Sequence, residues 1–246
     1  MSVIIRGLFL AAFFLGQLPM AQAFEERAPF QLAALANESS SPPVKGDPGT
    51  RPKETERAPI VWKPRVAGAP GGRVGGAVRG SSDLATPLVL APGNPGLTVQ
   101  AAPSLFWHID DAAPDGVKVF FTLIDEKGEI PLVETELEPP IQAGIQRIRL
   151  ASYGVELRLG ESYTWSIALV PDMDNRARDR VSQGFVERVA DNGDVSQEAR
   201  GLAAEGLWYD ALELLADEVE ANPGDPDALG RRRSLLTQAG VVIGAE

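Results

Sequence analysis

Short apolar segments with turn residues between them recur along residues 88–189, and this pattern limits the fold more than any other feature of the chain. The clearest segment is residues 117–124, whose alternation puts four apolar side chains on one face: Val117, Val119, Phe121 and Leu123. A hairpin turn at residues 125–128 and a returning segment at residues 130–137 follow. Because alternation of period two is typical of half-buried strands, the pattern predicts a β-hairpin here.

Further strands are expected in four stretches that share this alternation or are rich in β-branched residues: residues 104–109, 145–150, 162–170 and 181–189. Roughly six to eight short strands at this spacing are typical of a sandwich of two sheets. We therefore predict a mainly β domain over residues 86–190, with the fold of an antiparallel, immunoglobulin-like β-sandwich.

The apolar period changes to that of helices in residues 191–246, where a small helical hairpin or three-helix piece is expected. The first helix is predicted over residues 197–205, with Asp194 or Ser196 as its N-cap. Gly206 suits the position just after its end. Two further helices follow, separated by an Asn-Pro-Gly turn.

The first 23 residues have the order of a secretory signal peptide. Arg6 precedes an apolar run over residues 7–18, and Ala21 and Ala23 fit the positions that signal peptidase reads. The run is shorter than the roughly 20 residues that a membrane span needs, so cleavage after Ala23 is preferred to an uncleaved anchor. We expect an exported protein, periplasmic or secreted, with no transmembrane helix after cleavage.

Residues 24–85 are rich in Pro, Gly and Ser and contain few large apolar side chains. Such a composition buries too little surface to offset the entropy of ordering, which predicts a disordered tail. A tail strapped across the sheet is the alternative. Its glycine-rich residues 68–80 contain Arg73 and Arg79, which we expect to pair with acidic loops or with a partner.

The charges of the chain are unevenly distributed. Lys and Arg outnumber acidic residues in residues 45–79, whereas Asp and Glu dominate residues 191–227, and the net charge is −11. An acidic chain is a poor nucleic-acid binder, because phosphate contacts need a basic face. The acidic stretch is interpreted as a solvated face, with docking to the chain's own tail or to a basic partner as alternatives.

The helical region is similar to one tetratricopeptide repeat. Gly206, Trp208, Ala211 and Pro223 stand at the spacing of that repeat's turn glycine, aromatic residue, small packing residue and closing proline. Where the repeat usually has a second alanine, this chain has Glu218. A solenoid needs about three or more repeats, so the resemblance implies a hairpin that packs against the sheets or against a partner.

Four blocks of sequence, in this order, resemble the bacterial "domain of unknown function 928" family. They are residues 68–76, the pair Arg79-Gly80, residues 103–107 and residues 206–212. The resemblance implies a protein of the bacterial envelope that has a β domain and a C-terminal helical piece. It implies no activity.

The residues provide no clear catalytic, cofactor or metal motif. The chain has no cysteine, and its only histidine, His108, lies inside an expected strand, where a structural role is preferred to catalysis. Asp172, Asp174 and Asp179 form an oxygen-rich loop, but arginines interleave and the EF-hand spacing is missing. A solvated turn is therefore preferred to a calcium site. We expect no enzyme activity, no cofactor and no metal.

Three classes of function stay open. The first is a non-catalytic adaptor that binds another envelope protein, with these candidate contacts: Trp208, Tyr209, Asp210, Arg73 and Arg79. One of the two aromatic residues is expected to pack inward and the other to be exposed. The second class is a polysaccharide or cell-wall binder that uses aromatic residues on the strands, although alternating aromatics more often form a core. A hydrolase ranks last.

Overall fold

The residues that the computed structural model describes belong to one compact unit. The described residues are 59–65, 74–75, 84–126, 128 and 130–244. The expected signal peptide, most of the expected tail, Arg73 and Arg79 therefore lie outside the described residues.

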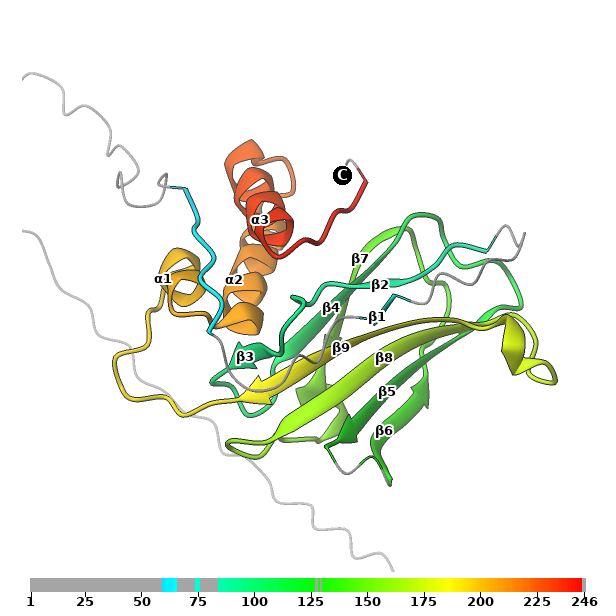
Figure 1. The fold of residues 1–246 in the computed structure, drawn as a ribbon. Coiled ribbons are helices and arrows are strands. Elements are labelled where there is room, and N and C mark those ends of the chain that lie inside the picture. Colours follow the sequence, from blue (N-terminus) through cyan, green and yellow to red (C-terminus); the bar gives the residue numbers. More distant parts are fainter. Residues whose placement is uncertain (1–58, 66–73, 76–83, 127, 129, 245–246) are drawn as a thin grey trace, which may run out of the picture. The chain divides into compact units, whose positions relative to one another are not determined.

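The described residues form nine β-strands followed by three α-helices (Figure 1). The strands are β1 (Val74–Gly75), β2 (Leu88–Val89), β3 (Gly96–Thr98), β4 (Ser104–Ile109), β5 (Lys118–Asp125), β6 (Pro131–Glu136), β7 (Gly144–Arg149), β8 (Ser162–Val170) and β9 (Arg180–Arg188). The helices are α1 (Ala199–Ala204), α2 (Trp208–Ala221) and α3 (Pro226–Gln238). Short 3-10 helices cover Leu150–Tyr153 and Arg176–Arg178.

The strands form two sheets. Six strands make the larger sheet, in the order β1-β9-β8-β5-β6 with β3 paired to β9. The smaller sheet has the order β2-β4-β7. The β3–β9 pair is parallel and the other pairs are antiparallel. The prediction of a mainly β chain with a C-terminal helical part is confirmed at this level.

The alternation in the sequence corresponds to burial in the larger sheet. Val119, Phe121 and Leu123 on β5 are at most 2% exposed, and they pair with the equally alternating β8. The predicted hairpin turn closes where the backbone N–H of Gly128 donates to the carbonyl oxygen of Asp125 at 3.1 Å. The φ angle of +66° at Gly128 lies in the left-handed region, which glycine adopts without strain.

The two sheets and the three helices share one hydrophobic core. The strand aromatics weighed above as a sugar platform all belong to it, since none is more than 2% exposed: Phe106, Trp107, Tyr163 and Trp165. The interpretation of these residues as core is confirmed, and they form no exposed platform for sugar stacking.

Helix α1 begins two residues later than predicted, because the predicted caps do not lie at its start. Its N-cap is Glu198, and no side chain caps it there. The Ser196 hydroxyl instead accepts a hydrogen bond from the Glu198 backbone N–H at 3.2 Å, which closes a turn before the helix. The helix ends at Ala204, one residue before the predicted end. The predicted role of Gly206 just after the helix is confirmed, because its φ is +81° and the N–H of Leu207 donates to the Leu202 carbonyl.

Within the described residues, no helix combines the length and the apolar character that crossing a membrane requires.

Candidate peptide-binding surface

Two aromatic side chains fix the start of α2 to the sheets. The indole Nε1 of Trp208 donates to the carbonyl oxygen of Leu90 at 2.9 Å. The hydroxyl of Tyr209 donates to the carbonyl oxygen of Phe185 at 2.8 Å and accepts from the Trp165 indole at 2.9 Å. These bonds satisfy polar groups that burial would otherwise leave unpaired, so α2 packs on the sheets in one defined position.

The first three residues of α2 face the interior of the protein. The expectation that one aromatic residue stays exposed is wrong, because Trp208 and Tyr209 are both 0% exposed. Asp210 is 4% exposed, and its Oδ2 accepts from the backbone N–H of Val99 at 3.3 Å. Burial raises the pKa of the Asp210 carboxyl and of the Tyr209 phenol. A partner cannot reach these three side chains while α2 and residues 59–65, described below, are docked.

Replacing Tyr209 by phenylalanine is expected to lower the free energy of unfolding by about 1–3 kcal/mol, because the Trp165 indole N–H and the Phe185 carbonyl then lose a buried partner. Tyr153→Phe is the matched control, since its side chain is 38% exposed and the change there should stay within about 0.5 kcal/mol. Urea unfolding of both variants measures the difference. Equal losses would contradict the role given to the buried hydroxyl.

The acidic side of α2 lies against two arginines of β7. The guanidinium of Arg147 binds the carboxylate of Glu213 and lies 2.5 Å from Asp217, and Arg149 lies 3.7 Å from Glu220. These three residues of the acidic stretch therefore dock within the chain on a strand of the smaller sheet, whereas the alternative named the tail. Sequence inspection missed this, because an arginine on a strand carries no signal of its distant partner. Asp191, Asp194 and Glu198 are exposed, as a solvated face predicts.

The ion pair between Arg147 and Glu213 is part of a larger polar network. The Ser104 hydroxyl donates to Glu213 at 2.6 Å and accepts from Arg147 Nε at 2.9 Å, and Gln100 donates to Glu213 at 2.8 Å. Burial alone would raise the pKa of Glu213, but the hydrogen bonds from Ser104, Gln100 and Arg147 and the charge of Arg147 lower it. The guanidinium also lies 5.4 Å from the centre of the Phe106 ring.

A separate peptide segment, residues 59–65, lies across the three helices and is called the strap below (Figure 1). The backbone N–H of Lys63 donates to the carbonyl oxygen of Ala203 in α1 at 3.1 Å. The Gln238 side chain of α3 accepts from the backbone N–H of Trp62 at 2.8 Å and donates to the carbonyl of Ile60 at 3.1 Å. The Trp62 ring packs edge-on against Trp208 of α2, with 5.0 Å between ring centres.

The strap has two side-chain anchors. Ile60 is 3% exposed and Trp62 is partly buried, whereas Val61 is 48% exposed and the remaining side chains of the strap are also exposed. Ordering each residue costs about 1–2 kcal/mol of backbone entropy. The strap orders seven residues and is anchored by only two side chains, so its docking has little net stability. Residues 59–65 are docked, but on the three helices and not across the sheet, where the strapped alternative placed the tail.

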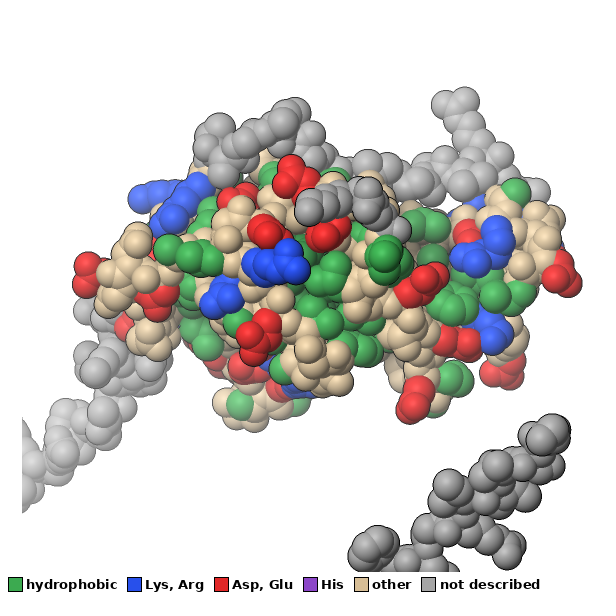
Figure 2. Space-filling model, turned by 90° about the horizontal axis from the view of Figure 1, so that it is seen from below, with side chains coloured by type: hydrophobic (Ala, Val, Ile, Leu, Met, Phe, Trp, Pro, Cys, Tyr) green, Lys and Arg blue, Asp and Glu red, His purple; other side chains and the backbone are tan. Residues whose placement is uncertain are grey.

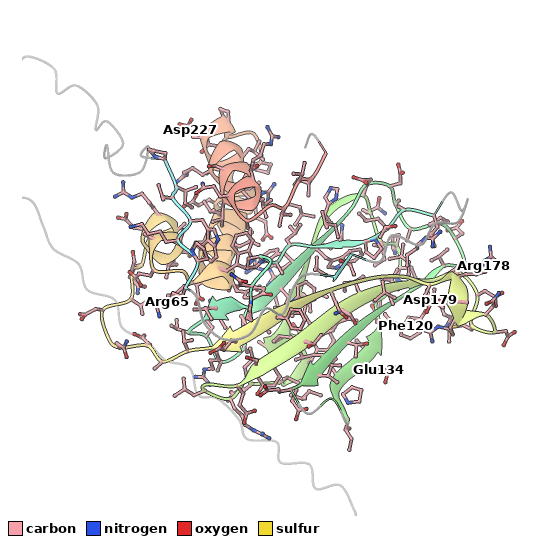
Figure 3. All side chains as sticks on the ribbon, in the orientation of Figure 1. Arg65, Phe120, Glu134, Arg178, Asp179 and Asp227 are labelled. Carbon is pink, nitrogen blue, oxygen red and sulfur yellow. The ribbon has the colours of Figure 1, made fainter. Side chains whose placement is uncertain are left out.

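Gly206 lets the strap pass close to the end of α1. A Cβ atom at this position would lie 2.8 Å from the carbonyl oxygen of Lys63 and 2.9 Å from the Arg65 side chain. The same residue has the left-handed φ described above, so the glycine serves both the helix end and the path of the strap. Figure 3 shows Arg65 at this end of the strap, while Asp227 marks the start of α3 near the other end.

Two open pockets flank the first residues of the strap. One has a volume of about 420 Å³ and lies between the start of α1, the second half of α2 and α3. The other, of about 480 Å³, lies between the strap and the first half of α3. Ile60 and Arg231 line both pockets, which therefore form one surface, called the helical groove below. Its lining also includes the exposed Ala221 and the helix residue Gly230.

The groove carries both signs of charge, with Glu198, Asp217 and Glu218 near Arg200 and Arg231. The face shown in Figure 2 likewise has acidic and basic side chains interspersed around hydrophobic ones. A lining of mixed charge and apolar side chains fits a peptide better than it fits a nucleic-acid backbone, which needs a basic surface.

The other residues singled out in the sequence have local partners. His108 is 7% exposed within β4, and its Nδ1 lies 3.7 Å from Asp110. In the oxygen-rich loop, Asp172 accepts from the backbone N–H of Asp174 at 3.0 Å, and Arg176 donates to Asp179 at 2.7 Å. Across the described residues, no three His, Cys, Asp or Glu side chains are grouped so that they could hold a metal ion.

Comparisons with known proteins bear on the family of the chain. The family model described as Domain of Unknown Function (DUF928) matches residues 74–243. A similar solved structure is the fn3 domain of human collagen alpha-1(XX) chain, at 14% identity and a TM-score of 0.26, with 50% of this chain and 95% of that chain covered. No curated protein matches the sequence.

Proposed function

Since this chain belongs to the domain of unknown function 928 family, we propose a function from its own surface: it is a non-catalytic adaptor of the bacterial envelope that binds another protein. The partner lies in the helical groove as an extended peptide. In this proposal the two sheets, which are antiparallel except for the β3–β9 pair, pack as an immunoglobulin-like β-sandwich that supports the helices. Export rests on the signal-peptide pattern of residues 1–23.

One observation carries the proposal: the helices already bind a peptide segment, the strap, largely through its backbone. Three hydrogen bonds join the backbone of the strap to Ala203 and Gln238, and only Ile60 and Trp62 supply anchoring side chains. Recognition through the backbone together with a few side-chain pockets is a general way in which proteins bind extended peptides. The two open pockets beside the strap extend the same surface.

The similarity of α1 and α2 to a tetratricopeptide repeat supports this interpretation, because helical-repeat surfaces bind extended segments of other proteins. The sheets cover the opposite side of α2 through Trp208 and Tyr209, so the single hairpin does not need neighbouring repeats to bury its apolar face. The groove side of the helices stays open for a partner.

Affinity capture from an envelope extract tests the proposal, with residues 24–246 as bait. The blocking variant is Gly230→Arg, because a Cβ at Gly230 meets open space within the groove and the change favours the helix. The matched control is Gly93→Arg, which adds the same side chain in open space outside the groove. We expect a protein that is retained by the wild type and by Gly93→Arg but lost from Gly230→Arg.

Two results would contradict an adaptor that binds its partner in the helical groove. One is a partner that all three baits retain equally, which would place binding outside the groove. The other is a glycan that all three retain without any protein, which would transfer the function to the strands. Circular dichroism of the three baits checks that each variant is folded.

A further inference from the structure

We propose that the strap is a replaceable internal ligand, and that the partner's peptide enters its site with the same pattern: an aliphatic residue two positions before a tryptophan. This inference rests on the proposed function and specifies its partner. The partner displaces residues 59–65 and takes over their contacts with Gln238, Ala203 and Trp208.

Gln238 is the residue that recognises the peptide backbone. Its side-chain oxygen accepts from the N–H of Trp62 and its side-chain nitrogen donates to the carbonyl of Ile60, two residues earlier. One amide side chain thereby satisfies the donor and the acceptor that an extended peptide presents on one edge. These contacts are independent of the peptide's side chains, so another chain of the same shape can make them.

The sequence preference of the site follows from its two anchors. Ile60 is 3% exposed and lies where both pockets of the groove meet. Trp62 packs at an interplanar angle of 75° against the buried ring of Trp208, an edge-to-face arrangement that favours an aromatic side chain there. The residue between them is exposed, so its identity is free.

Displacement is feasible because the strap holds its site weakly while its neighbourhood stays accessible. Only two of its side chains are anchored, and the pockets on either side of Ile60 give an incoming chain a place to bind first. While the strap occupies the site, the partner cannot bind there. The apparent affinity of the partner is therefore its intrinsic affinity multiplied by the fraction of molecules whose site is empty.

A labelled synthetic peptide of residues 58–66 tests the inference by fluorescence anisotropy on the full mature chain. In the double variant Ile60→Ser, Trp62→Ala the chain's own strap loses its anchors, and this variant is expected to bind the peptide roughly tenfold more tightly than the wild type does. Adding Gln238→Ala to the double variant should weaken binding by about tenfold. A scrambled peptide is the control.

Absence of peptide binding to the folded double variant, or equal binding of the scrambled peptide, would overturn the inference. Sedimentation of the wild type gives a second check. A dimer that dissociates when the free peptide is added would show that a second copy of this chain occupies the site, which would overturn the inference of a partner protein. A monomer whose captured partner is released by the peptide supports the inference. A captured partner that needs the groove but resists the peptide overturns this inference and leaves the adaptor function intact.

Discussion

Replacing Arg147 by methionine is expected to lower the free energy of unfolding by about 1.5–3 kcal/mol, the range for hydrogen bonds to charged groups, because the partly buried Glu213 loses its cationic partner. The Arg147 side chain is 10% exposed and that of Glu213 is 17% exposed, so the remaining carboxylate would have little access to water. Urea unfolding at neutral pH measures the loss.

The matched control is Arg149→Met, two positions along the same strand. The Arg149 side chain is 55% exposed, and its one ion pair, with Glu220, spans 3.7 Å. An exposed pair of this kind contributes about 0–1 kcal/mol. Similar losses for the two variants would mean that the network around Arg147 does not fix α2 to the sheets.

The same pair gives the wild type a pH dependence. The folded pKa of Glu213 is lower than the ordinary value of 4.5, so the pairing stabilises the fold above that pH. This contribution is lost as the pH falls through the folded pKa. Burial raises the pKa of Asp210, so the contribution of this carboxyl to stability falls as the pH rises. Asp210 is present in both the wild type and Arg147→Met, so it does not account for a difference between them. The difference in stability between wild type and Arg147→Met should therefore shrink in acid.

The second large effect is expected for Trp208→Ala, which should lower the free energy of unfolding by about 3–5 kcal/mol. The substitution empties a fully buried site, leaves the Leu90 carbonyl without its indole donor and removes the ring against which the strap packs. Thermal or urea unfolding gives the loss. Limited proteolysis with trypsin should show faster cleavage after Arg65 in the same variant.

Trp62→Ala is the control for this prediction, since it removes the other ring of the same aromatic pair. Trp62 is partly buried and lies in the strap, so its loss should cost about 1–2 kcal/mol while also speeding cleavage after Arg65. If the two substitutions destabilise the protein equally, Trp208 does not have the structural role described above.

Features that depend on local chemistry could be predicted from the sequence. The alternation in β5 and β8 gave their strands and inward faces, and the strand aromatics were correctly interpreted as core. Gly206 ends α1 as its position indicated, because only a residue that tolerates a left-handed φ fits there.

Features that depend on distant contacts could not be predicted. Arg147 and Glu213 are 66 positions apart, and nothing near either residue indicates that they meet. The burial of both Trp208 and Tyr209 required the sheets to come close to α2, where a Cβ at Gly96 would lie 2.6 Å from the Tyr209 ring. Neither the hydrophobic period of α2 nor its acidic composition carries that information.

The strap lies between these two cases. Residues 24–85 are polar when their composition is taken as a whole. This average hides a short cluster of large apolar residues, Ile60, Val61 and Trp62, which is flanked by Pro59 and Pro64. Such a cluster inside a proline-rich segment is the local signal of a docking peptide. Its binding site, however, is formed by three helices more than 130 positions later in the chain.

The most direct test of the adaptor function is site-specific photo-crosslinking of the full chain in its host cells. A photo-reactive residue at Ala221 lies in the helical groove, and one at Ile130, which is 77% exposed, lies outside it. We expect a crosslink to another envelope protein from Ala221 and none from Ile130. A protein crosslinked only from Ile130, or no protein crosslink from Ala221, would contradict a partner bound in the groove.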